Sequence, residues 1–207
     1  MMKKLLALLL AAVLVLTLGA CGKPAEEEQK PLPSPADANT VAEAFIRAFR
    51  TRDFITRFSL YLYDARAAWE ADTIAAHGSA EAFFAEAEKQ AKEKGIDVTV
   101  DSFDSYYSAY YRYIQEDYQE IYGEHTITVT ATGSVKMTDD LLPEFRTTLL
   151  EGPNGKKFDK AVLDSITEVY TITVNCTVQG EKKDFSEDYL VYVVNHDGRW
   201  LVANYSA

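Results

Sequence analysis

The hydrophobic pattern of the chain changes its period at Gly123, and no other feature of the sequence limits the fold as strongly. Before Gly123, apolar side chains recur every three or four residues, which is typical of one face of an α-helix. After Gly123 they alternate with polar residues, which is typical of β-strands with one buried face. Helices first and strands last favour an α+β fold, in which N-terminal helices pack against a curved antiparallel sheet.

Two helical segments are expected at the start of the folded part. Thr40-Val41-Ala42-Glu43 has the sequence of a capping box, in which the threonine and glutamate side chains accept from free amides at a helix start. An apolar stripe follows and predicts a helix that extends to about Asp53. The stretch 54–77 is rich in aromatic residues and alanine, and it predicts a second, less regular helical region with Trp69 in the core.

A third helix is expected between Ser79, which can cap its start, and Gly95, which allows the left-handed conformation that ends many helices. Apolar and polar residues alternate directly after this glycine, over residues 96–100. This alternation predicts a short strand.

The stretch SYYSAYYRYIQEDYQEIYG, residues 105–123, contains seven of the 13 tyrosines of the chain. Six apolar residues of this stretch keep helical spacing: Tyr107, Tyr110, Tyr111, Ile114, Tyr118 and Ile121. The pattern predicts a long amphipathic helix with a phenolic face. Phenols combine apolar area with a polar tip, so this face suits either a domain core, the more common case, or a cavity for sugars, peptides or aromatic compounds.

A strand is expected after Gly123, with its apolar residues on one face: Ile127, Val129, Ala131, Val135 and Met137. Residues 138–167 predict a helical insertion, with helical runs over 141–150 and 158–166 around the turn-forming EGPNGKK. Three more strands are expected over 169–178, 189–194 and 200–205, the last two joined by a hairpin at Asn195-His196-Asp197-Gly198. Cys176 alternates with aliphatic residues and is therefore expected in the core.

This order of elements, and the closing VVNHDGRWLVANY in particular, resembles the NTF2-like (cystatin-like) fold. The resemblance implies a cone-shaped sheet, and it makes Tyr107, Tyr110, Tyr111 and Trp200 candidates for lining a ligand pocket. Some proteins of this fold, such as ketosteroid isomerases and polyketide cyclases, use an Asp with Tyr or His at the mouth of the sheet. The resemblance thus implies an alternative enzymatic role, in which one of the three tyrosines acts with an acid such as Asp101 or Asp104.

The N-terminus has the layout of a secretory signal, with Lys3 and Lys4 followed by an apolar run from Leu5 to Leu18. As a helix this run would extend about 21 Å, which is too short for a hydrocarbon core of about 30 Å. Leu18-Gly19-Ala20-Cys21 is similar to the lipobox of bacterial lipoproteins. That resemblance implies a diacylglyceryl group on Cys21 and cleavage just before it, whereas the alternative is an ordinary secreted protein with a chance cysteine.

Three segments follow from this reading: a signal peptide at 1–20, a lipidated cysteine with a tether at 21–39, and one domain at 40–207. The tether is rich in proline and acid and lacks aromatic residues, so it cannot bury enough surface to fold. Removal of Lys3 and Lys4 with the signal changes the net charge from −11 to −13. A chain this acidic offers no basic stripe to phosphates, so we expect no nucleic-acid partner.

The sequence contains no constellation that is typical of a reaction. His77, His125 and His196 have no partners at metal-ligand spacing, and EGPNGKK lacks the spacing of a phosphate-binding loop. We therefore expect neither a metal nor another cofactor. The expected function is that of a lipid-anchored module, outside the cytoplasm, that binds a small ligand or an envelope protein.

Overall fold

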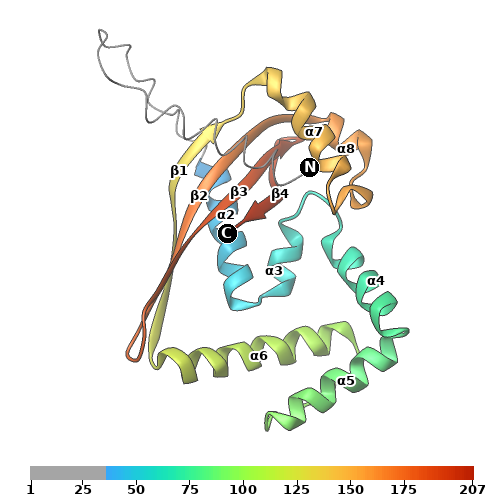
Figure 1. Ribbon diagram of the computed structural model, residues 1–207, viewed down its shortest axis with the longest axis vertical. Coiled ribbons are helices and arrows are strands. Elements are labelled where there is room, and N and C mark those ends of the chain that lie inside the picture. Colours follow the sequence, from blue (N-terminus) through green and yellow to red (C-terminus); the bar gives the residue numbers. More distant parts are fainter. Residues whose placement is uncertain (1–35) are drawn as a thin grey trace. The chain divides into compact units, whose positions relative to one another are not determined.

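The structure is a computed structural model, and it describes residues 36–207, to which every structural statement below refers. The chain is α+β, as the change of period predicted: helices come first and a four-stranded antiparallel sheet closes the chain (Figure 1). The helices before the sheet are α2 (Ala36–Thr51), α3 (Phe54–Ser59), α4 (Ala65–His77), α5 (Ala80–Glu93) and α6 (Phe103–Tyr122).

The sheet is a meander in which each strand pairs with its neighbour in the sequence. Its strands are β1 (His125–Lys136), β2 (Ile166–Gly180), β3 (Phe185–His196) and β4 (Arg199–Ser206). The predicted insertion between β1 and β2 is confirmed and forms two short 3₁₀ turns, Asp139–Leu141 and Gly155–Lys157, with helices α7 (Leu142–Glu151) and α8 (Lys160–Asp164). The hairpin between β3 and β4 is confirmed as well, because Asp197 and Gly198 both have positive φ angles, of 51° and 77°.

The core lies between α2 and the inner face of the sheet. Phe45 and Ile46 of α2 are fully buried there, and they share one cluster with aliphatic residues of β2 and β3. Cys176 belongs to this cluster and is also fully buried, so the prediction of a core cysteine is confirmed.

The predicted start of the first helix is wrong, because α2 begins at Ala36, four residues before Thr40. Ala38, in the first turn, is fully buried in the main core, so packing against the sheet extends the helix beyond the capping sequence. Glu43 contacts β1 instead, since its Oε1 accepts a hydrogen bond of 2.8 Å from the Ala131 amide beside the bulge of that strand.

The strand predicted over residues 96–100 is absent from the described structure. Ile96 and Val100 are buried, but no strand lies beside them. The Val100 amide donates instead to Glu88 Oε2 of α5, at 3.1 Å. The alternation of apolar and polar residues therefore indicates here which side chains are buried, but the backbone pairs with no neighbouring strand.

A bulge between Ala131 and Gly133 shifts the pairing of β1 with β2 by one residue. Because side chains alternate between the two faces of a strand, a shift of one residue exchanges them. Ile127 and Val129 precede the bulge and face the core, but Val135 follows it and is 54% exposed. The prediction that Val135 points inward is thus wrong.

The end of α6 is joined to the tip of the β2–β3 hairpin. The Lys182 amide donates to the carbonyl oxygen of Tyr122 at 3.0 Å, and Gly180 comes so close that a Cβ there would lie 2.5 Å from the same oxygen. From this joint α6 extends away from the sheet toward α5 (Figure 1). Helix α6, which contains the tyrosine stretch, thus connects the sheet to α5.

Candidate functional site

A small pocket lies where α5 packs against α6, and three tyrosines of α6 line it. Its volume is about 160 Å³. Its lining includes Phe83, Ala87 and Ala91 from α5, and Tyr106, Ala109, Tyr110 and Tyr113 from α6. This volume is close to the roughly 150 Å³ cavity that accommodates one benzene ring.

Local sequence explains where the two helices begin and where α6 ends. Ser79 caps α5 as predicted, since its hydroxyl accepts from the Ala82 amide at 3.1 Å. A reciprocal capping box starts α6: Ser102 accepts from the Ser105 amide at 3.2 Å, and Ser105 accepts from the Ser102 amide at 3.0 Å. Gly123 ends α6, as predicted.

Small and large side chains alternate around the pocket and create its space. The three alanines leave room between the helix backbones, while the rings close the sides. Phe83 and Tyr106 meet edge to face, with ring centroids 4.8 Å apart, and Tyr106 stacks on Trp69 at 5.7 Å. Burial among these rings raises the pKa of Tyr106 to about 12, so its phenol stays protonated at neutral pH.

The rim of the pocket is polar. Gln90 Nε2 donates to Glu86 Oε1 at 3.0 Å, and His77 Nε2 lies 3.8 Å from the other oxygen of the same carboxylate. At the end of α5, Lys94 Nζ lies 4.8 Å from the ring centroid of Tyr113 on α6, and the hydrogen bond to that phenol raises the pKa of the lysine. An apolar floor with a few polar groups at the entrance is the usual composition of a small-molecule site.

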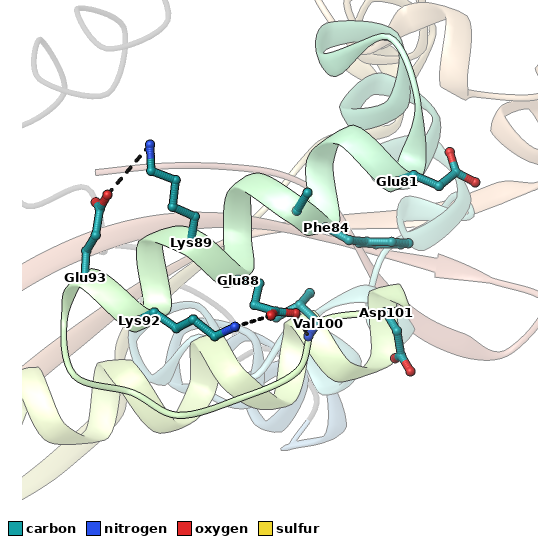
Figure 2. A pocket seen from close by; sticks show the side chains of 9 residues that line it. Glu81, Phe84, Glu88, Lys89, Lys92, Glu93, Val100 and Asp101 are labelled. Atoms are coloured by element: carbon teal, nitrogen blue, oxygen red, sulfur yellow. Dashed lines mark hydrogen bonds and ion pairs between the residues drawn. The ribbon is translucent and has the colours of Figure 1, made fainter.

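A larger groove of about 810 Å³ lies along another side of α5, and it is lined mainly by charged residues. Figure 2 shows that these charges pair with one another: Lys89 Nζ lies 3.8 Å from Glu93 Oε1, and Lys92 binds Glu88. Such exposed pairs along a helix stay solvated and contribute little. The aromatic pocket is smaller and more enclosed than this groove, and it is therefore the better candidate for a binding site.

Tyr107, the first of the predicted pocket residues, belongs to the core. It is 4% exposed and lies among Phe54, Phe58 and Trp69. Its hydroxyl donates to Glu70 Oε1 at 3.1 Å. The enzymatic alternative pairs Tyr107, Tyr110 or Tyr111 with an acid such as Asp101 or Asp104, but the carboxylate that Tyr107 meets is Glu70 of α4.

Arg66 bridges the Glu70 carboxylate and Asp104. Arg66 Nε binds Glu70 Oε1 at 2.7 Å, and Arg66 Nη2 binds Asp104 Oδ1 at 2.9 Å. Asp104 is thus paired with Arg66, and neither it nor Asp101 bonds to Tyr107. The network ties α4 to α6.

Of the other predicted residues, only Tyr110 lines the aromatic pocket. Tyr111 is 42% exposed, because the buried face of α6 runs through Tyr107, Ile114, Tyr118 and Tyr122. Trp200 lies on β4 and meets Tyr170 of β2 edge to face at 5.6 Å, so the structure does not bring it to the tyrosines of α6. Sequence reasoning missed Tyr106, Tyr113 and Phe83. The available signal was the pair Ala87 and Ala91, because two small residues spaced by four leave room on one face of α5.

The remaining predicted sites involve the cysteine and the metal ligands. Cys21, the expected lipid attachment site, lies outside the described residues. Within residues 36–207, no group of three or more His, Cys, Asp or Glu side chains is placed to hold a metal ion. None of the helices in that part of the chain combines the length and hydropathy that a membrane crossing requires.

Comparisons of the chain with protein-family models, with curated proteins and with solved structures found no match.

Proposed function

We propose that this chain is a lipoprotein outside the cytoplasm, held in the membrane by lipid on Cys21, whose domain binds a small single-ring molecule between α5 and α6. The observation that supports the binding role is the aromatic pocket of about 160 Å³, with its polar rim. The lipobox-like Leu18-Gly19-Ala20-Cys21 supports the anchor. The order of helices and strands, which resembles the NTF2-like fold, is compatible with a binding module.

Binding is favoured over acid-base catalysis by the surroundings of Tyr107. Its phenol donates to Glu70, and that carboxylate is already engaged by Arg66. Burial and the neighbouring carboxylate raise the pKa of this phenol. A phenol held in this way stabilises the helix pair, and the open aromatic space lies next to Tyr106 and Tyr110 instead.

The binding role predicts that phenol, used as a probe, binds the full chain with a Kd of about 1 mM, as expected for a ligand of a few heavy atoms. Ala91→Leu places a larger side chain in the pocket and is expected to weaken binding at least about tenfold. Protein NMR with ¹⁵N-labelled chain measures both constants. The matched control, Ala85→Leu, makes the same change on the charged side of α5 and should leave the Kd unchanged. Equal Kd values for the two variants would contradict the proposed pocket.

The anchor predicts that the full chain, produced in a bacterium that processes lipoproteins, carries acyl chains on Cys21. Cys21→Ser is expected to abolish the lipid mass and release the domain from the membrane fraction, since two or three acyl chains are needed for firm anchoring. Mass spectrometry and fractionation measure this result. Cys176→Ala changes the other, buried cysteine and should keep the lipid. A bare Cys21 in the wild-type product is the outcome that would refute the anchor.

A further inference from the structure

Four aromatic rings follow one another along the wall of the α5–α6 pocket. The ring centroids of Phe83 and Tyr106 lie 4.8 Å apart. Those of Tyr106 and Tyr110 lie 5.7 Å apart, and those of Tyr110 and Tyr113 lie 5.9 Å apart. All four rings line the same space of about 160 Å³, so they converge on one accessible volume. A wall of this kind suits a flat ring, which packs against it edge to face or offset.

The same wall favours positive charge. Aromatic rings attract ammonium groups through their π electrons, and phenol oxygens accept hydrogen bonds from N–H groups. The chain itself uses one of the four rings in this way, because Lys94 Nζ lies 4.8 Å from the ring centroid of Tyr113. The pocket is therefore lined with groups that stabilise a cation.

Glu86 supplies a negative charge at the entrance, and it is the only carboxylate in the lining of the pocket. Its side chain is 55% exposed, so it can be reached from the solvent. Gln90 Nε2 donates to its Oε1 at 3.0 Å, but an amide carries no charge. Within residues 36–207, no lysine or arginine nitrogen lies within 4.0 Å of this carboxylate, which thus keeps its negative charge.

His77 does not cancel the charge of Glu86 when its ring is neutral. His77 Nδ1 lies 2.9 Å from the carbonyl oxygen of Thr73, which can only accept, so Nδ1 carries the proton. The other ring nitrogen, Nε2, lies 3.8 Å from Glu86 Oε2 and has no proton in the neutral ring. The carboxylate oxygen therefore remains an acceptor without a donor from His77.

Two other acids of α5 have lysine partners. Glu88 pairs with Lys92, and Glu93 Oε1 lies 3.8 Å from Lys89 Nζ (Figure 2). These four residues line the charged groove and not the aromatic pocket. The acid that lines the pocket thus differs from its neighbours on the same helix, because no lysine compensates it.

Lys94 is less suited to bind an anion than Glu86 is to bind a cation. The hydrogen bond to the phenol of Tyr113 raises the pKa of Lys94, and the carboxylates of Asp117 and Glu120 raise it further. Those carboxylates would repel an anionic ligand beside the lysine. Lys94 follows Glu86 by eight residues, about 12 Å along the helix, so it lies too far away to neutralise that acid.

We propose that the single-ring molecule bound between α5 and α6 is a cation, whose ring lies in the aromatic pocket and whose short ammonium arm reaches Glu86. This inference rests on the proposed binding role and names the ligand class. The volume accommodates one ring, and the ammonium group stays at the solvated entrance, where it loses little hydration. The net charge of −11 also favours the approach of cations over anions.

The test titrates the ¹⁵N-labelled full chain with benzylamine, benzyl alcohol and benzoate, at pH 8, where an ordinary imidazole is neutral. We expect benzylamine to bind at least about fivefold more tightly than benzyl alcohol, from the exposed ion pair and the ring contacts together, and benzoate to bind most weakly. Glu86→Gln keeps the shape of the side chain and removes its charge. It should raise the Kd of benzylamine to that of benzyl alcohol, whose own Kd should not change.

Glu93→Gln is the matched control, since it removes the same charge from α5 outside the pocket and should keep the preference for benzylamine. Equal Kd values for benzylamine and benzyl alcohol in the wild-type chain would overturn the proposal, and so would a preference that survives Glu86→Gln. In both cases benzyl alcohol would still report an intact pocket. If none of the three compounds saturates, the binding role between α5 and α6 fails as well.

Discussion

Replacement of Trp69 by alanine is expected to lower the free energy of unfolding by about 3 kcal/mol, at the lower end of the range for large aromatic residues because Trp69 is only partly buried. Its ring meets six others from α3, α5 and α6, with centroids between 5.5 and 6.2 Å apart: Phe54, Phe58, Phe83, Phe103, Tyr106 and Tyr107. Each aromatic contact contributes beyond the area it buries. Urea unfolding measures the loss.

The other tryptophan of the chain is the matched control. Among the residues that the structure describes, Trp200 makes one ring contact, with Tyr170, so Trp200→Ala should cost less than Trp69→Ala. Trp69 packs against Tyr106 and Phe83, two rings that line the pocket. Trp69→Ala should therefore also abolish phenol binding, which Trp200→Ala should preserve. An equal loss of stability in the two variants would mean that the ring of Trp69 does not hold α4 against α3, α5 and α6.

The fold class could be predicted because the period of apolar residues is a local property. Helices before Gly123 and strands after it follow from the spacing alone, and so do the cap at Ser79 and the turn at Asp197-Gly198. These features depend on residues within a few positions of each other. The sequence therefore carries them independently of the tertiary structure.

The predictions that failed depend on contacts between distant segments. Val135 turns outward because of a bulge in the pairing with β2, and α2 starts early because Ala38 packs in the core. The exposed Tyr111 shows the same limit, since helical spacing fits several faces of α6 and only the packing against Phe54 and Val178 selects one. Tertiary packing decides between local patterns that are equally good.

The candidate site was predicted only in part for the same reason. Tyr110 was identified because it lies in the tyrosine stretch, but the pocket exists because alanines of α5 face it. That pairing joins residues separated by about 20 positions in the chain, which no spacing rule connects.

High pH is expected to unfold the protein steeply, because buried tyrosines keep their protons. Tyr107 and Tyr189 are 4% and 1% exposed. Burial raises the pKa of both phenols well above the ordinary value of about 10, and the neighbouring carboxylates Glu70 and Glu187 add to the shift. Below about pH 10 both phenols are protonated in the folded and unfolded states, so they add no pH dependence there.

Above about pH 10 the unfolded chain loses these protons first, so the unfolded state is favoured as the pH rises. Each phenol lowers the free energy of unfolding by about 1.4 kcal/mol per pH unit until its folded pKa is reached. The two together amount to at most about 5 kcal/mol between pH 10 and 12, which is comparable to the whole stability of many domains. Circular dichroism and the ultraviolet absorbance of phenolate should therefore change together in one cooperative transition.

Two variants of α6 test the assignment to a buried phenol. Tyr107→Phe removes the titrating group, so the fall in stability above about pH 10 should become shallower by about 1.4 kcal/mol per pH unit, although the lost hydrogen bond to Glu70 costs about 1 kcal/mol at neutral pH. Tyr111→Phe makes the same change at an exposed position and should leave the slope unchanged. If the free energy of unfolding, measured with urea at several pH values, fell equally steeply with pH in both variants, the alkaline transition would arise elsewhere. The buried hydroxyl of Tyr107 would then have no part in it.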